Sequence, residues 1–149
     1  MRAVAVDLDG ALGDTRPLWE AWLEDARRRF RVELDVPAER AEAPAALDAA
    51  LGNWRVLLER FAEDHAPVYL RPSADASASL RRLEAAGARV GAFTDAPEEL
   101  ARVALSHLGA LRRLEAVEAG EGALDRLLAR LGSDADVVRT PVELRRAAA

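Results

Sequence analysis

The sequence predicts an α/β fold built on a parallel sheet, and three observations support this prediction. Four short apolar stretches typical of buried strands, at 2–8, 88–95, 113–119 and 135–140, alternate with stretches of helical periodicity. The first strand runs directly into acidic residues, and a long run of helical sequence separates it from the second. Because parallel strands are joined by crossover helices, we expect a Rossmann-like sheet covered by helices on both faces.

The first half of the chain supplies one strand and a helical insert. Residues 2–8 are apolar and are followed by the turn signal Asp9-Gly10. Pro17 suits the first turn of a helix over 17–31, and a second amphipathic helix is predicted over 47–65. Residues 35–46, which hold two prolines, read as a connection between these helices, and residues 66–72 interrupt the pattern. We therefore expect a small helical cap at 14–68 and a core formed by 1–13 and 69–149.

The second half repeats a strand and helix alternation. Gly87, Gly109 and Gly132 each follow a helical stretch, as glycine often does at helix ends. The predicted elements, in order, are helix 73–86, strand 88–95, helix 97–109, strand 113–119, helix 123–131, strand 135–140 and a final helix from 141. The polar residues at the carboxyl ends of parallel strands should meet at one edge of the sheet, where such folds bind ligands. These are Asp7, Asp9, Thr94, Asp95, Arg139 and Thr140.

The composition excludes several classes of function. The net charge of −5 and the 5% of aromatic residues do not suit a nucleic-acid interface, and no apolar run reaches the length of a membrane span. We therefore expect no nucleic-acid partner, no membrane and a cytoplasmic protein. The chain has no cysteine, which excludes disulfides and thiolate metal sites. It also has no lysine, so any role that needs a fixed cation falls to one of its 21 arginines.

Two acidic side chains follow the first strand one residue apart, at Asp7 and Asp9. Carboxylates held close together repel each other and lose solvation, so the pair needs a cation, a shared proton or a reaction. A turn at an Asp-Gly sequence would explain these residues without any chemistry.

The stretch 7-DLDGALGD-14 resembles the first motif of the haloacid dehalogenase superfamily, which usually reads DxDGT. The stretch 92-AFTDAPEELARVALSHLGA-110 resembles the second motif of that superfamily, a strand that ends in Thr or Ser before a helix. The position of the insert is similar to that of the helical cap in the phosphoglycolate phosphatase-like branch. The resemblance implies a haloacid dehalogenase-like core with a helical cap after the first strand. The sheet would be shortened, because only one helix follows the last predicted strand.

The resemblance also implies a chemistry for the site. Asp7 would be the nucleophile that forms an aspartyl-phosphate, and Asp9 the general acid and base. Gly10 and Thr94 would face the phosphate. The strand-end residues Asp95 and Arg139 are further candidates for binding it, although Asp95 could instead cap the helix that starts near Pro97. Magnesium would be held by Asp7, by the backbone carbonyl of Asp9 and, as a third acid, by Glu143. The substrate would be a small phosphorylated metabolite.

The chain departs from the motifs of the superfamily in ways that oppose this metal. Ala11 stands where the first motif has Thr, and the third-motif lysine is missing, with Arg126 the nearest arginine. Arg139 stands where the fourth motif has a metal-binding Asp. A guanidinium about 4 Å from a divalent cation repels it by about 8 kcal/mol at an effective dielectric constant near 20.

Two functions therefore stay open. The first is a phosphatase of the haloacid dehalogenase type. The second is a catalytically impaired member that binds a phosphate-like anion or a protein partner, with Arg139 as a fixed cation against Asp7 and Asp9. A dehalogenase is a third possibility. Asp9 disfavours it, because the dehalogenase branch usually lacks this second aspartate. The edge of the shortened sheet could be covered by a second copy of the chain, so a homodimer is a further expectation.

Overall fold

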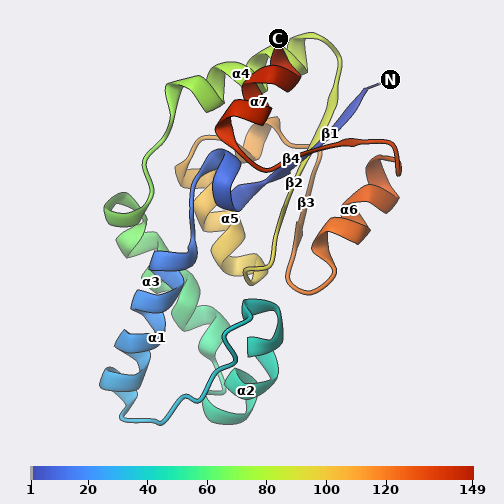
Figure 1. The fold of residues 1–149 in the computed structure, drawn as a ribbon. Helices are drawn as coiled ribbons and strands as arrows, with labels where there is room; N and C mark the ends of the chain where they lie inside the picture. Colours follow the sequence, from blue (N-terminus) through green and yellow to red (C-terminus); the bar gives the residue numbers. More distant parts are fainter. Residues whose placement is uncertain (1) are drawn as a thin grey trace.

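The computed structural model describes residues 2–149, and within them the strands form one parallel sheet in the order β3-β2-β1-β4 (Figure 1). Strand β1 pairs with β2 on one side and with β4 on the other, so β1 lies inside the sheet. The predicted fold class is confirmed. The strands are β1 (Ala3–Asp7), β2 (Arg89–Thr94), β3 (Ala116–Ala119) and β4 (Asp136–Val138).

Helices cover both faces of the sheet because the strands are apolar on both sides. Ala3 and Ala5 of β1 belong to a small cluster with Leu127 of α6. Val4 and Val6, which point to the opposite face, belong to the main core, to which the other six α-helices of residues 2–149 contribute. Figure 1 shows α6 on one side of the sheet and α4 and α7 on the other. The covering helices are α4 (Ala74–Ala85), α5 (Glu98–His107), α6 (Ala123–Leu131) and α7 (Pro141–Ala148).

Residues 14–68, which we call the helical segment, contain the helices that extend beyond the sheet in Figure 1. Their apolar faces meet around Trp19, Trp22 and Trp54, which are all buried. The ring centroids of Trp19 and Trp22 are 5.4 Å apart, and those of Trp22 and Trp54 are 6.1 Å apart. The elements are α1 (Arg16–Phe30), a 3₁₀ turn η2 (Arg40–Glu42), α2 (Ala43–Ala50) and α3 (Trp54–Tyr69).

The predicted helix over 47–65 was wrong as a single element. The chain instead forms α2 and α3, separated at residues 51–53, where Leu51 adopts an extended conformation. The predicted connection 35–46 holds η2 and the start of α2, because Pro44 fits a first helical turn. Helix α3 also continues through Pro67 to Tyr69. A proline in the last turn removes only one backbone hydrogen bond, and the chain breaks after it rather than at residue 66.

All four strands are shorter than the predicted ranges, and β3 and β4 differ most. Residues 111–113 form a 3₁₀ turn, and β3 begins only at Ala116. Strand β4 ends at Val138, so Arg139 and Thr140 follow it. The Thr140 hydroxyl accepts a hydrogen bond from the Glu143 backbone N–H and caps α7. Within residues 2–149, no helix combines the length and the apolar character that a membrane crossing requires.

Candidate active site

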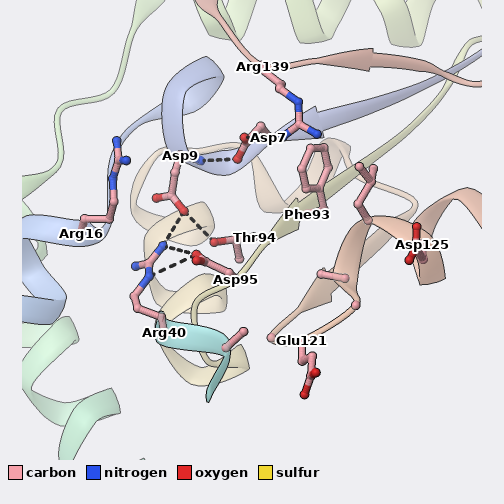
Figure 2. A pocket seen from close by; sticks show the side chains of 15 residues that line it. Asp7, Asp9, Arg16, Arg40, Phe93, Thr94, Asp95, Glu121, Asp125 and Arg139 are labelled. Carbon is pink, nitrogen blue, oxygen red and sulfur yellow. Dashed lines mark hydrogen bonds and ion pairs between the residues drawn. The ribbon is translucent and has the colours of Figure 1, made fainter. Parts of the chain in front are cut away.

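A cavity of about 440 Å³ lies at the carboxyl ends of the strands (Figure 2). The sheet and its loops contribute five of the six strand-end side chains expected from the sequence. The sixth, Thr140, does not line the cavity. The helical segment contributes Arg40, which the sequence did not single out. The expected residues in the lining are Asp7, Asp9, Thr94, Asp95 and Arg139.

The loop after β1 is a tight π-type turn, η1 (Leu8–Leu12), which requires a glycine. Gly10 has φ +122°, and a Cβ atom at this position would lie 2.5 Å from the backbone oxygen of Arg139. Two backbone N–H groups of this turn are used within the loop. Asp9 N donates to Asp7 Oδ1 at 3.0 Å, and Gly10 N donates to Gly13 O at 2.7 Å. These two N–H groups therefore fix the loop and do not face the cavity as free donors.

Asp9 accepts hydrogen bonds from four donors. Its Oδ1 accepts from the backbone N and the Oγ1 of Thr15, both at 2.7 Å. Its Oδ2 accepts from Thr94 Oγ1 and from Arg40 Nη2, also at 2.7 Å. The side chain is 10% exposed. The two oxygens of this carboxylate thus have a complete set of hydrogen-bond donors.

Arg40 is the cation of this network and is only 4% exposed. Its Nη2 lies 2.7 Å from Asp9 Oδ2 and 2.6 Å from Asp95 Oδ1, and its Nη1 donates to Thr15 Oγ1 at 2.7 Å. Figure 2 shows this guanidinium between the two carboxylates. The absence of lysine was the only signal that an arginine was needed here. Arg40 lies 31 residues from Asp9 in a stretch expected to be a loop, so no local pattern identified it.

Asp7 lies apart from this network, beside Arg139. Arg139 Nη1 lies 3.4 Å from Asp7 Oδ2, and its guanidinium stacks over the Phe93 ring at 5.2 Å. Burial and the neighbouring negative charge of Asp9 raise the pKa of Asp7, and the Asp9 backbone N–H and Arg139 offset this rise only in part. The expected contact of Arg139 with Asp7 is present, whereas Asp9 is neutralised by Arg40 instead.

The raised pKa of Asp7 predicts a pH-dependent effect on stability. The folded state binds a proton at Asp7 more tightly than the unfolded chain, so this residue lowers the free energy of unfolding as the pH rises above its ordinary value of 3.8. Asp7→Asn keeps an acceptor for the Asp9 N–H but has no charge. We expect the variant to be more stable than the wild type at pH 7.5, and the difference to shrink towards pH 4, as measured by urea unfolding.

Asp125→Asn is the matched control for this prediction, because Asp125 lines the same cavity but is exposed and has no ion pair within residues 2–149. It should show no such trend with pH. A variant Asp7→Asn that is less stable than the wild type at pH 7.5 would contradict the assigned direction of the pKa shift.

The acids expected to hold magnesium are not assembled. Glu143 Oε1 accepts a hydrogen bond from the Arg139 backbone N–H at 3.2 Å, and Glu143 does not line the cavity. Among residues 2–149, no group of three or more Asp, Glu or His side chains is placed to hold a metal ion. The Asp7 carboxylate, another expected ligand, lies beside the guanidinium of Arg139, whose positive charge repels a divalent cation. In this arrangement, the residues present do not fit a divalent cation.

Arg126, the arginine nearest to the expected lysine, does not reach the site. Its guanidinium pairs with Glu118 at 2.9 Å and donates to the backbone carbonyls of Ala119 and Glu121. These contacts hold it at the end of β3. The positive charges near Asp9 and Asp7 therefore come from Arg40 and Arg139, respectively.

The structure has a parallel sheet, two aspartates at the end of its first strand, and helices inserted directly after them. These features define an α/β protein of the haloacid dehalogenase-like fold. Comparisons with solved structures confirm this fold. CbbY from Rhodobacter sphaeroides, solved in complex with phosphate, matches with a TM-score of 0.64 at 15% identity and covers 87% of this chain and 72% of that one. A HAD phosphatase from Thermococcus onnurineus matches with a TM-score of 0.57 at 18% identity, over 99% of this chain and 97% of that one.

The similarity extends to a protein with another reaction. The L-2-haloacid dehalogenase from Xanthobacter autotrophicus matches with a TM-score of 0.51 at 16% identity, over 92% of this chain and 68% of that one. No protein-family model and no curated protein matches the chain. At these identities the similarity establishes the fold, and the function has to be argued from the site.

Proposed function

We propose that this chain is a hydrolase that cleaves small phosphate monoesters through an aspartyl-phosphate at Asp7. The observation that supports the proposal most directly is the exposure and hydrogen bonding of the Asp7 carboxylate. It lines the cavity, is 18% exposed, and within residues 2–149 its Oδ2 has only the 3.4 Å contact with Arg139. A carboxylate oxygen that faces a cavity without a short hydrogen bond is available for attack on a phosphorus atom. The fold shared with a phosphatase supports the same reading.

The reaction then proceeds in two displacements. An Asp7 oxygen forms a bond to phosphorus while the ester P–O bond breaks, and the alcohol leaves after it gains a proton. A water molecule next attacks the aspartyl-phosphate, which releases inorganic phosphate and restores the carboxylate. Arg139, whose guanidinium lies beside Asp7, offsets the charge of the phosphoryl group. No step in this proposal uses a metal ion.

The remaining expected residues have narrower roles in the proposal. Once one of its own oxygens is released, Asp9 would take up a proton from solvent, give it to the oxygen of the leaving alcohol, and then take a proton from the attacking water. Thr94 and Gly10 hold the geometry of Asp9 and of the loop, since their donors are bound there. Asp95 is a partner of Arg40 rather than a phosphate ligand. The helical segment, which supplies Arg40, would act as the cap over the substrate.

Hydrolysis of p-nitrophenyl phosphate tests the proposal directly. The assay compares the wild type, Asp7→Asn and the control Asp125→Asn, each with Mg²⁺ and with a chelator. We expect turnover by the wild type and by Asp125→Asn, and a loss of at least about 10³-fold in Asp7→Asn, because the nucleophile is gone. Equal rates for the wild type and Asp7→Asn over a panel of phosphate esters would overturn it. Turnover that occurs only with Mg²⁺ would show that the site rearranges to admit the metal.

A second candidate function is anion binding without turnover, and the four donors on Asp9 favour it. A carboxylate that stays in this network cannot exchange protons with a substrate. This function predicts that the wild type binds inorganic phosphate in calorimetry without hydrolysing any ester. Arg139→Gln should then weaken the binding, because it removes the cation beside Asp7.

A further inference from the structure

The saturated hydrogen bonding of Asp9 limits what the proposed enzyme can do in this arrangement. A carboxylate offers about four acceptor positions, and Asp9 uses them for Thr15 N, Thr15 Oγ1, Thr94 Oγ1 and Arg40 Nη2. No position remains for a proton. Any role of Asp9 as an acid or base therefore requires that one of these donors leaves.

Arg40 is the donor that a ligand can remove. The Thr15 groups are fully buried and lie six residues from Asp9, directly after the loop that carries it. Thr94 is the last residue of β2 and is also buried. Arg40, in contrast, lies on the helical segment and has a long side chain that lines the cavity. Figure 2 shows its guanidinium between Asp9 and Asp95, on the side of the cavity opposite Arg139.

An anion is the chemistry that can compete for this guanidinium. Arginine binds carboxylates and phosphates with two parallel hydrogen bonds, so such a group can replace the contacts to Asp9 and Asp95. Asp95 is 48% exposed and can return to water when Arg40 leaves. A neutral hydroxyl offers no such replacement, since it would leave Arg40 without a counter-charge in a buried place.

We infer that the substrate carries a second anionic group, besides the phosphoryl group that is transferred, and that this group draws Arg40 away from Asp9. The inference rests on the proposed function, because it assigns the phosphoryl group to Asp7 and Arg139. The second group binds Arg40, and the vacated Asp9 oxygen can then take up a proton from water and deliver it to the oxygen of the leaving alcohol. Arg40 is in this way a specificity-determining residue that couples substrate binding to the release of Asp9.

A matched pair of ligands tests this inference without turnover. Glycerol 2-phosphate and 2-phosphoglycerate differ only by the replacement of one CH₂OH group with a carboxylate. In calorimetry with Asp7→Asn, we expect 2-phosphoglycerate to bind about tenfold more tightly, which corresponds to about 1.4 kcal/mol. A third ligand, glycerol 1,2-bisphosphate, has a second phosphate and no carboxylate, so it shows whether a phosphate serves as the second anion as well as a carboxylate does. Equal affinities for all three ligands would overturn the inference.

Variants of three arginines identify which residue causes the preference for 2-phosphoglycerate over glycerol 2-phosphate. Arg40→Gln in the Asp7→Asn background should abolish it. Arg16→Gln is the control, because Arg16 also lines the cavity but is exposed and pairs with Asp14. It should leave the preference intact. Arg139→Gln should weaken the binding of all three ligands to the same extent. A preference that survives Arg40→Gln or disappears in Arg16→Gln would contradict the assignment.

Asp95→Asn provides a second test if Arg40→Gln does not fold. This variant keeps Arg40 but removes one of its two carboxylate partners, at a half-exposed position. We expect it to increase the preference for 2-phosphoglycerate, and an unchanged or smaller preference would count against the inference. Hydrolysis is measured separately on the wild type. A clear binding preference without hydrolysis would overturn the proposed function and leave the exchange of Arg40 supported.

Discussion

Replacing Arg40 with methionine is expected to lower the free energy of unfolding by about 3–5 kcal/mol. Methionine fills a similar volume but leaves the Asp9 carboxylate, which is 10% exposed, without its cation. It also leaves Thr15 Oγ1 without the donor that Arg40 Nη1 supplies. An unpaired buried charge is among the most destabilising single changes. Urea unfolding at pH 7.5 measures the effect.

Arg139→Met is the matched control for the Arg40 prediction. Arg139 also pairs with a site aspartate, but it is 55% exposed and the contact is 3.4 Å long. An exposed pair of this kind contributes about 1 kcal/mol or less. If the double variant Arg40→Met/Asp9→Asn is more stable than Arg40→Met, the loss comes from the stranded charge. Similar losses for Arg40→Met and Arg139→Met would contradict the view that burial makes Arg40 different.

Replacing Trp22 with alanine is expected to destabilise the protein by about 3–5 kcal/mol. Trp22 is 2% exposed and packs between Trp19 of α1 and Trp54 of α3, with the ring separations given above. Its removal leaves a cavity at the centre of the helical segment, and the neighbouring rings lose their aromatic contacts. Thermal and urea unfolding measure the loss, and Trp22→Phe should recover part of it.

Phe30→Ala, on the same helix, is the control for this prediction, because Phe30 is 40% exposed. It should cost less than about 1 kcal/mol, as is usual for exposed positions. If Trp22→Ala costs no more than Phe30→Ala, the three tryptophans do not form the core of the helical segment. Their placement would then have to be explained by contacts with a ligand.

The sequence predicted the sheet well because its signals are local. Each strand is a short apolar run bounded by turn residues, and the order of strands and helices leaves little choice but a parallel sheet. The helical segment was predicted less well. The break at residues 51–53 has no proline, and the apolar spacing continues across it from Leu47 to Trp54. The local signal for the break is Gly52-Asn53, two residues that favour turns, and the continuing apolar spacing outweighed it in the prediction.

Some residues of the candidate site could likewise be predicted from the sequence, and others could not. The placement of Asp7, Asp9 and Thr94 at one edge follows from strand order alone, because parallel strands end at the same edge. The roles of Glu143 and Arg126 did not follow from the sequence. Each residue satisfies a backbone group beside it, Glu143 at the Arg139 N–H and Arg126 at the carbonyls after β3. Such contacts depend on where the chain turns, which periodicity does not specify.

The sequence by itself thus determined the parallel sheet and the pair of carboxylates at the end of its first strand, because both depend on residues that are neighbours along the chain. The place of Arg139 at a strand end also predicted its contact with Asp7, because parallel strands end at one edge of the sheet. Only the tertiary structure showed that Arg40 is the cation of Asp9. Arg40 meets Asp9 across 31 residues and Asp95 across 55. These contacts are fixed by the packing of the helical segment against the sheet, and no local pattern encodes them.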